Sequence, residues 1–489
     1  MHIAITMKKP EKHVNGQMSL AGLDEWSDGL TAKRADVFCK RSGKVRHEWL
    51  SLCKEERALT RDLMAQIVEP SNLVAALRQV VSNKGSAGVD GMSVKELQDW
   101  FSSNWSTLQH QLVSGTYRVS AVCEVQIPKP KGGHRILGIP TVKDRLVQQA
   151  ISQVLSKRYE PIFSEHSYGF RPNRRAKDAL REAGEYVANG KDWVVDIDLE
   201  KFFDTVNHHR LMWLLGTRIG DEVLLRLISR FLRAGMLKDG LVSQRVKGTP
   251  QGSPLSPLLS NIVLDELDKE LERRDHCFVR YADDLIIMVA SELSAKRVQS
   301  SLTKYIEKRL LLKVNTEKSR ISRPSELNFL GHRILPDGQL GLSRTSEARF
   351  KKKLKYLTRR NRGISLEQLV GELNPVLRGW FNYFKDARMR SRLGKLTSWL
   401  NRRIRCFRLK QCKRALGIAR WLNKLGVPWN RCWTTAGSNK SWHRLSMTHA
   451  AHEAMNLKWF KSMGLFNLTE NYVKHLKKPP STTNVRWVV

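Results

Sequence analysis

Paired cysteines and long apolar runs are both missing from this sequence of 489 residues. The seven cysteines are odd in number, scattered, and nowhere spaced Cys-x-x-Cys, which argues against a disulfide framework and against a zinc cluster. No apolar run reaches the roughly 18–20 residues that a membrane span needs. The N-terminus also lacks the signal-peptide order of charge, apolar segment and cleavage site. We therefore expect a cytoplasmic protein without a membrane partner.

Acidic residues are scarce in the whole chain and absent from one long part of it. Lys and Arg number 85 against 47 Asp and Glu, which gives a net charge of +38. Residues 387–452 contain no acid, although 16 of these positions are Lys or Arg. A solvated helix face normally carries both signs, so this stretch predicts a surface that follows a phosphate backbone. Nucleic acid is the first candidate partner, and an anionic membrane surface is the second.

Two adjacent carboxylates, Asp283 and Asp284, stand between segments rich in β-branched and aromatic residues. The pattern predicts a hairpin with the two acids at its turn. Burying neighbouring charges is costly unless something pairs with them, and Mg²⁺ commonly uses one or two carboxylates plus substrate phosphates. An ordinary polar turn is the alternative interpretation.

A second acidic stretch precedes this hairpin. Asp196 and Asp198 alternate with apolar residues, so a strand would carry both on one face. A strand ending in carboxylates and a hairpin tipped with two more is typical of a polymerase palm. Three carboxylates at one sheet edge repel one another and are tolerable only with cations between them. Two-metal phosphoryl transfer uses such a cluster.

Several loops carry residues suited to nucleotide or nucleic-acid contacts. Residues 122–139 predict a hairpin whose basic tip, 128–135, could neutralise a triphosphate. Arginines and aromatic residues fill the loop at 167–174, which suits contacts to backbone and bases. Gly and Pro residues at 247–257 predict an irregular loop before a helix, where Gln251 could contact a sugar or base. A solvated turn and a plain helix-start loop are the alternatives.

The C-terminal third changes character. Three basic helices are predicted at residues 348–361, 366–384 and 388–414, and another helical, amphipathic segment at about 446–477. Tryptophans are interleaved with the cations, and a few of them could stack on bases.

Together these blocks resemble the reverse transcriptase/maturase proteins encoded by bacterial group II introns. The resemblance begins near residue 73 and keeps the order of the family's blocks. It ends with Leu-Arg-Gly-Trp-Phe-Asn-Tyr-Phe at 377–384, which looks like the maturase-domain signature. The blocks are 84–91, 128–149, 168–173, 196–208, 249–261, 281–284, 315–318 and 329–332.

The resemblance implies site residues one by one. Asp198, Asp283 and Asp284 would be the catalytic, metal-binding carboxylates for two Mg²⁺ ions, with the main-chain carbonyl of Leu199 completing one metal shell. Asp196 lies outside this triad in the family pattern. Phe203 would lie under the sugar and reject a ribose 2′-hydroxyl, which favours dNTPs over rNTPs.

Further roles follow from the same resemblance. Gln251 would contact the incoming nucleotide, and Lys129, Lys131 and Arg135 are the candidate triphosphate ligands. Lys318 would donate a proton to pyrophosphate. The basic surface adds the predicted nucleic-acid contacts Arg171, Arg378, Arg402, Arg403, Arg405, Arg408 and Lys410.

The implied fold class is α+β. Residues 61–342 would form the fingers and palm of a right-hand polymerase with a small antiparallel sheet. Residues 343–415 would form an all-α thumb/maturase domain, and 416–489 a helical, basic, DNA-binding domain. Residues 1–60 are read as a partly disordered extension of unknown role.

The implied function is an RNA-directed DNA polymerase that binds its group II intron RNA, assists splicing, and copies the intron into a target DNA (retrohoming). The sequence up to Val489 shows neither the His and Asn residues nor the Cys-x-x-Cys pairs of the family's endonuclease domain, so a member lacking that domain is expected. We expect no obligate protein partner and, in a bacterial cytoplasm, association with the nucleoid when DNA is bound. The alternative is a domesticated relative that serves phage defence, repair or spacer acquisition.

Overall fold

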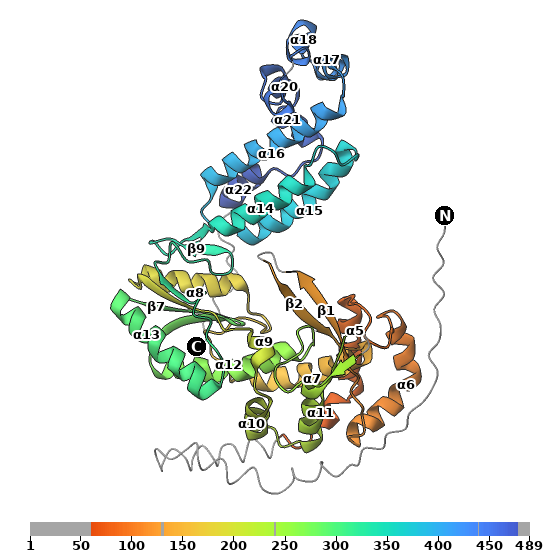
Figure 1. Ribbon diagram of the computed structural model, residues 1–489, viewed down its shortest axis with the longest axis vertical. Helices are drawn as coiled ribbons and strands as arrows, with labels where there is room; N and C mark the ends of the chain where they lie inside the picture. Colours follow the sequence, from red (N-terminus) through yellow and green to blue (C-terminus); the bar gives the residue numbers. More distant parts are fainter. Residues whose placement is uncertain (1–59, 129–131, 239–240, 439, 478–489) are drawn as a thin grey trace.

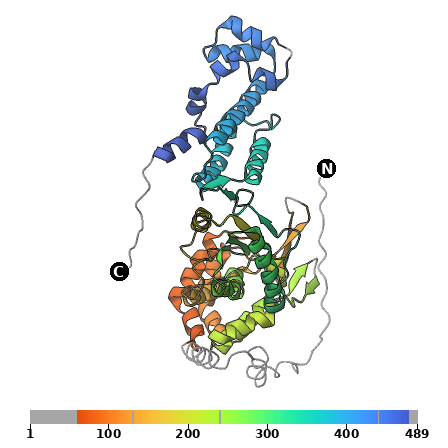
Figure 2. The same cartoon turned by 90° about the vertical axis from the view of Figure 1, so that its left-hand side faces the viewer.

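The computed structural model describes residues 60–128, 132–238, 241–438 and 440–477, and it shows two lobes arranged along one long axis (Figure 1). The lower lobe mixes helices and strands, and the upper lobe is built of helices (Figure 2). The predicted mixture of helices with small sheets is therefore confirmed. The extension at 1–60 lies almost wholly outside the described residues.

The central sheet of the lower lobe positions the acidic residues. It contains β3 (Trp193–Ile197), β6 (Cys277–Tyr281), β7 (Asp284–Val289) and β8 (Arg320–Ser322) in the order β6-β7-β3-β8, and every neighbouring pair is antiparallel. The predicted hairpin around the two acids is formed by β6 and β7.

Both faces of this sheet are covered, which explains why its strands are almost uniformly apolar. On one face Ile286 and Met288 pack with α8 (Ala176–Ala188). On the other face Leu285 and Ile287 join the main core, which also contains residues of α12 (Ser256–Arg273) and α13 (Glu292–Tyr305). The last turn of α13 continues as a π-helix, Ile306–Leu310. Figure 1 shows α8 on one side of the sheet and α12 and α13 on the other.

A second sheet has the order β2-β1-β4-β5. Its hairpin β1 (Val122–Pro128) and β2 (His134–Ile139) confirms the predicted pair of strands. The short strands β4 (Met236–Lys238) and β5 (Leu241–Ser243) extend it.

Helices pack around these sheets, and two of them begin at residues suited to a helix start. Pro70 is the first residue of α5 (Pro70–Ser82), and the Asn72 side chain donates to the Ile67 carbonyl at 2.9 Å, which closes the break after α4 (Leu63–Ile67). Thr141 caps α7 by accepting a hydrogen bond from the Asp144 amide. The remaining lower-lobe helices are α6 (Glu96–Val113), α7 (Val142–Tyr159), α9 (Phe202–Thr205), α10 (His208–Arg218) and α11 (Glu222–Arg233).

The three basic helices predicted for the upper lobe are present as α14 (Arg344–Leu357), α15 (Leu366–Phe384) and α16 (Arg390–Gln411). None of the helices in the described residues is both long and apolar enough to cross a bilayer. Shorter helices complete the lobe: α17 (Ala415–Lys424), α18 (Trp429–Ala436), α19 (Trp442–Leu445), α20 (His449–Ala454), α21 (Leu457–Ser462) and α22 (Leu468–Lys477).

The upper lobe has two apolar clusters that do not divide the chain at residue 415. One cluster joins α16 to α17, α18 and α20. The other contains α14, α15 and α16 together with Leu468 and Tyr472 of α22, because α22 lies beside α16.

The two lobes meet at a hairpin, β9 (His332–Ile334) and β10 (Leu340–Leu342). The Arg388 amide donates to the Leu340 carbonyl at 2.7 Å. Lys177 of α8 forms an ion pair with Asp386, which follows α15. These contacts attach the helices of the upper lobe to the β9–β10 hairpin and to α8, which covers one face of the central sheet.

Candidate active site

Strand register brings the predicted carboxylates to one edge of the central sheet. Ile197 of β3 faces Leu285 of β7. One position beyond this pair, at the ends of the two antiparallel strands, Asp198 lies opposite Asp284. Directly opposed residues of antiparallel strands have Cα atoms about 4.5–5.5 Å apart. Asp283 lies beside them in the turn between β6 and β7.

The turn that carries Asp283 has an unusual backbone. Ala282 adopts φ = +59°, in the left-handed region that side chains other than glycine rarely enter. Arg280, only 1 % exposed, holds this turn by donating from Nη1 to the Ala282 carbonyl at 2.9 Å. Its Nε donates to the carboxylate of Asp268 on α12 at 2.7 Å. The buried ion pair between Arg280 and Asp268 therefore fixes the turn to α12.

A second layer supports the same turn. Asn261 of α12 accepts from Arg280 at 3.0 Å and donates to the Gly169 carbonyl at 2.9 Å. A Cβ at Gly169 would lie 2.0 Å from the Ala282 amide nitrogen, so only glycine allows this approach. Our sequence reasoning missed Arg280, Asn261 and Gly169 as supports. The available signal was an arginine inside an apolar strand and an asparagine inside an apolar helix, because buried polar groups need partners.

Asp283 and Asp284 hold their protons unusually tightly. Asp284 is exposed on one side, but the surrounding protein still removes much of its hydration. This burial, together with the charges of Asp283, Asp196 and Asp198, raises the pKa of Asp284 to about 6. Burial and Asp198 also raise the pKa of Asp283, while Arg135 and Arg280 oppose that rise. Cations bound between these groups would relieve the repulsion.

Two of the acids are engaged by cationic side chains. Lys318 Nζ lies 3.1 Å from Asp198 Oδ2, and Arg320 Nε lies 3.5 Å from Asp196 Oδ2. The described part of the chain contains no ready-made group of three His, Cys, Asp or Glu side chains that could hold a metal ion. The set of oxygen donors nevertheless suits Mg²⁺. Its binding would require Asp198 to exchange Lys318 for the cation.

The main chain around Leu199 is also fixed. The Asn315 amide donates to the Asp198 carbonyl, and the Glu200 amide donates to the Lys313 carbonyl, both at 2.8 Å. Leu199 between them forms a β-bridge with Val314.

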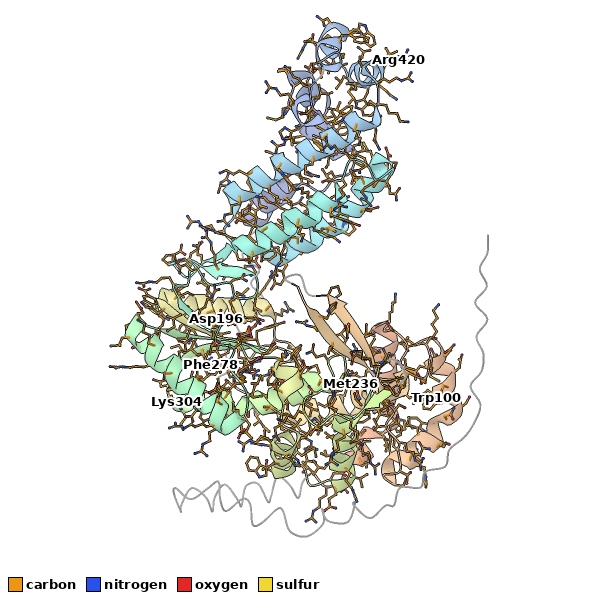
Figure 3. The ribbon with its side chains drawn as sticks, viewed as in Figure 1. Trp100, Asp196, Met236, Phe278, Lys304 and Arg420 are labelled. Carbon is orange, nitrogen blue, oxygen red and sulfur yellow. The ribbon has the colours of Figure 1, made fainter. Side chains whose placement is uncertain are left out.

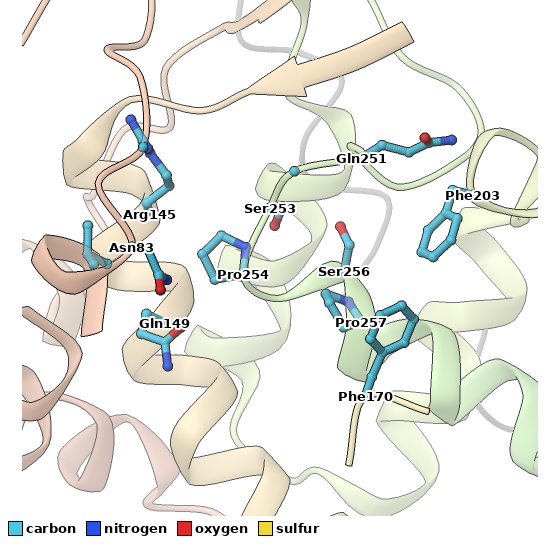
Figure 4. A pocket seen from close by; sticks show the side chains of 13 residues that line it. Asn83, Arg145, Gln149, Phe170, Phe203, Gln251, Ser253, Pro254, Ser256 and Pro257 are labelled. Atoms are coloured by element: carbon cyan, nitrogen blue, oxygen red, sulfur yellow. The ribbon is translucent and has the colours of Figure 1, made fainter. Parts of the chain in front are cut away.

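A cavity of about 460 Å³ lies between α5, α7 and the loop that precedes α12. Figure 4 shows Phe203 and Gln251 along one side of it and Asn83 and Arg145 along the other. The predicted nucleotide contacts Phe203 and Gln251 are thus brought together. Asn83, Arg145 and Gln149 also line the cavity, and our sequence reasoning did not single them out.

Backbone contacts hold these two residues in place. The Gly138 amide of β2 donates to the Gln251 carbonyl at 2.9 Å, so the loop is attached to the basic hairpin. The Phe203 ring meets the rings of Phe170 and Phe202 edge to face, at centroid distances of 6.4 and 5.4 Å.

The cations predicted to bind the triphosphate lie on that hairpin. Lys129 and Lys131 fall outside the described residues. Arg135 is exposed on β2, and its charge acts on Asp283, so it faces the acidic edge of the sheet.

Two of the predicted nucleic-acid contacts point inward, and a third is partly exposed but held by contacts within the chain. Arg171 is buried and donates to the carbonyls of Ser164 and Ser167 as well as to Glu160. Arg405 is buried and donates to the Met455 carbonyl at 3.0 Å. These two predictions are corrected: the structure gives both side chains internal roles, because their guanidinium groups donate to main-chain carbonyls inside the fold. The third, Arg403, is committed to Thr358, Lys355 and the Trp399 ring.

The remaining four predicted contacts reach the surface. Arg378 is exposed, and Arg402, Arg408 and Lys410 are partly exposed. The Arg408 guanidinium lies over the Trp421 ring at 3.8 Å from its centroid.

Two protein families match separate parts of this chain. Residues 127–334 match the family described as Reverse transcriptase (RNA-dependent DNA polymerase). Residues 348–426 match the family described as Group II intron, maturase-specific domain.

Three curated proteins illustrate the similarity. Protein YkfC of Escherichia coli (strain K12) is 32% identical over 317 residues, which cover 56% of this chain and 82% of that protein. The group II intron-encoded protein LtrA of Lactococcus lactis subsp. cremoris is 30% identical over 339 residues, 56% of each chain. A putative COX1/OXI3 intron 2 protein of Saccharomyces cerevisiae is 28% identical over 54% of this chain and 37% of its own. This chain thus spans about half or less of the length of the two intron proteins.

Proposed function

The chain belongs to the family of group II intron-encoded reverse transcriptases and maturases, and from this premise we propose that it is an RNA-directed DNA polymerase that also binds its own intron RNA. One observation carries the polymerase assignment. The pairing of Ile197 in β3 with Leu285 in β7 supports a cluster of Asp198, Asp283 and Asp284 at the ends of these strands, and Phe203 and Gln251 line a cavity in the same lobe.

The chemistry we propose is attack of a primer 3′-hydroxyl on the α-phosphate of a dNTP. Two Mg²⁺ ions held by Asp198, Asp283, Asp284 and the Leu199 carbonyl would supply activation of the hydroxyl and stabilisation of the leaving pyrophosphate. Lys318 lies beside Asp198 and would donate a proton to the pyrophosphate as it leaves.

The other residues of the site bind and select the nucleotide. Arg135, with Lys129 and Lys131, would neutralise the triphosphate from the basic hairpin. Phe203 would exclude a ribose 2′-hydroxyl by its bulk, and Gln251 would contact the sugar or base. The substrates proposed here are therefore dNTPs on an RNA template.

The upper lobe supports a second role, in which the protein stabilises its intron RNA in a splicing-competent fold. Its acid-free stretch supplies exposed cations, and α18 at the far end of the lobe exposes Trp429 and Trp433, a combination suited to phosphates and stacked bases. Figure 3 shows how far Arg420, in this distal part, lies from Asp196 in the central sheet. We further propose that the same lobe contacts target DNA, so that the copied intron enters a new site.

Primer extension tests the polymerase assignment. Asp283→Asn keeps the size of the side chain and removes its charge. We expect dNTP incorporation on a primed RNA template with Mg²⁺ to fall at least about a thousandfold, since the reacting groups lose a metal ligand. Asp275→Asn, an exposed acid just before β6, is the matched control and should retain full activity. Wild-type incorporation by Asp283→Asn would refute the assignment.

A further inference from the structure

A second cavity, of about 240 Å³, lies inside the upper lobe between α16, α21 and the beginning of α22. Part of its lining is apolar and includes Leu400, Leu457, Phe460, Leu465 and Leu468, and polar and charged side chains form the rest. The cavity holds several water-sized volumes of about 30 Å³ each, so it is larger than a site for one bridging water.

Three asparagines, Asn401, Asn467 and Asn471, contribute amide groups to the lining of this cavity. Asn401 is only 5 % exposed, and its amide has no hydrogen-bond partner among the described residues. Asn471 donates to the Asn467 carbonyl at 2.7 Å, and Asn467 Oδ1 accepts from the Glu470 amide at 3.0 Å. The Oδ1 of Asn471 and the amino group of Asn467 remain free for a ligand. Because Asn401 lines the cavity and has no hydrogen-bond partner among the described residues, its amide can donate to and accept from a ligand there.

Amide groups suit a ligand that both donates and accepts hydrogen bonds. The edge of a nucleobase has this property, and the apolar part of the lining suits its faces. A metal ion would instead require several carboxylates, whereas Glu470 is the one acid among the lining residues.

Cations surround the mouth of the cavity. Arg378 is exposed, with its guanidinium 4.8 Å from the centroid of the Phe466 ring. Lys461 and Lys474 are exposed as well. The acid among the lining residues, Glu470, is already paired with Lys474 at 2.8 Å. The excess positive charge at the rim fits the phosphates on either side of an inserted base.

We infer that this cavity binds one unpaired nucleotide of a bound RNA, with its base against Asn401, Asn467 and Asn471 and its phosphates at the cationic rim. The inference rests on the RNA-binding role proposed above. RNA is favoured because α15 and α16, which form part of the lining, lie inside the stretch that matches the maturase-specific domain. Splayed-out single bases are also the usual target of specific RNA recognition.

The test compares two RNA hairpins that differ by a single bulged 2-aminopurine, bound to the full chain. The wild type should bind the bulged hairpin about tenfold more tightly than the fully paired one, the effect expected of one buried base. Fluorescence of the 2-aminopurine should change on binding. Asn401→Leu keeps the volume and removes the amide, so it should lose both the preference and the fluorescence change while binding the paired hairpin as before.

Ser398→Ala, at an exposed position on the same helix, is the control and should behave like the wild type. Asn471→Ala, at a partly exposed position, is a second variant that tests the site without altering the buried core.

Loss of the preference in Asn471→Ala supports the site even where Asn401→Leu folds poorly. Retention of the full preference by both variants, or its absence in the wild type, overturns the inference. An equal preference for a bulged DNA hairpin overturns the choice of RNA. Failure to bind either RNA hairpin refutes the RNA-binding role itself, which is a distinguishable result.

Discussion

The two lobes differ in how their like-charged side chains are arranged. The lower lobe gathers carboxylates at one sheet edge, where burial and the neighbouring acids raise the pKa of Asp284, and it holds the turn that carries them with the buried Arg280. The upper lobe leaves acids out of residues 387–452 altogether. Repulsion between like charges is thus concentrated at a point in one lobe and spread over a surface in the other. A concentrated cluster suits small, doubly charged metal ions, and a spread surface suits a polyanion.

Even so, the number of cations in the upper lobe is not the number available to RNA. Arg402 and Arg405 lie in the same helix, yet Arg402 is partly exposed and Arg405 is buried against the Met455 carbonyl. Net charge therefore identifies the partner, whereas packing decides which cations reach it.

The largest effect is expected from disturbing the close contact between Gly169 and Ala282, which supports the turn that carries Asp283. Gly169→Ala would place a methyl group 2.0 Å from the Ala282 nitrogen and push the turn away. Because misplacement of reacting groups by about 1 Å can cost 100-fold in rate, we expect dNTP incorporation to fall at least about 100-fold. Affinity for RNA should not change.

Gly216→Ala on α10 is the control, since a Cβ there meets nothing within 4 Å. Normal polymerisation by Gly169→Ala would show that the turn does not need this close support.

The next effect separates steric selection from binding in the lower lobe. Phe203→Ala should admit rNTPs, and the ratio of dNTP to rNTP incorporation should fall by about tenfold or more. Single-nucleotide extension with each substrate measures this ratio. Phe203→Tyr keeps the bulk and should keep the selection. An unchanged ratio in Phe203→Ala would exclude this side chain as the selecting group.

A moderate effect distinguishes internal from surface arginines in the upper lobe. Arg405→Met removes the donor to the Met455 carbonyl and should lower the free energy of unfolding by about 1–3 kcal/mol, measured by urea denaturation. Its RNA affinity should stay within twofold of wild type under conditions where the variant is folded. Arg402→Met should do the reverse, with weaker RNA binding and little change in stability. Weaker RNA binding by folded Arg405→Met would restore this residue to the binding surface.

The smallest effect concerns stability without Mg²⁺. The pKa of Asp284 is about 6 in the folded protein and near the ordinary 3.8 in the unfolded chain. The folded state therefore binds this proton more tightly, and ionisation destabilises it progressively between about pH 4 and 6 and fully above pH 6. In EDTA, Asp284→Asn should melt a few degrees above wild type at pH 8 and at the same temperature near pH 4.

Added Mg²⁺ should narrow the difference at pH 8 by stabilising the wild type. A difference in melting temperature that does not depend on pH would mean that repulsion among the ionised carboxylates is not its cause.

The sequence predicted those features that depend on local periodicity. Alternation around Asp198 and the apolar segments around Asp283 were enough to predict a strand at the first and a hairpin turn at the second, and the helices of the upper lobe follow their apolar spacing. Strand register then determined which acids meet.

Features that depend on distant partners were not predictable in the same way. The burial of Arg405 depends on the Met455 carbonyl in another part of the upper lobe. The support from Arg280 requires the position of Asp268, which only the packing of α12 against the sheet reveals.

The central claim is that polymerisation belongs to the lower lobe and RNA binding to the upper lobe. One salt titration of RNA binding tests it most directly, with wild type, Asp283→Asn, and the double variant Arg402→Gln/Lys410→Gln on the same structured RNA. We predict that Asp283→Asn keeps the wild-type affinity and salt dependence. The double variant should bind more weakly, and its slope against log salt concentration should fall by about 0.7 for each phosphate that the protein no longer neutralises. Weakened binding by Asp283→Asn together with an unchanged slope in the double variant would contradict the separation of the two roles.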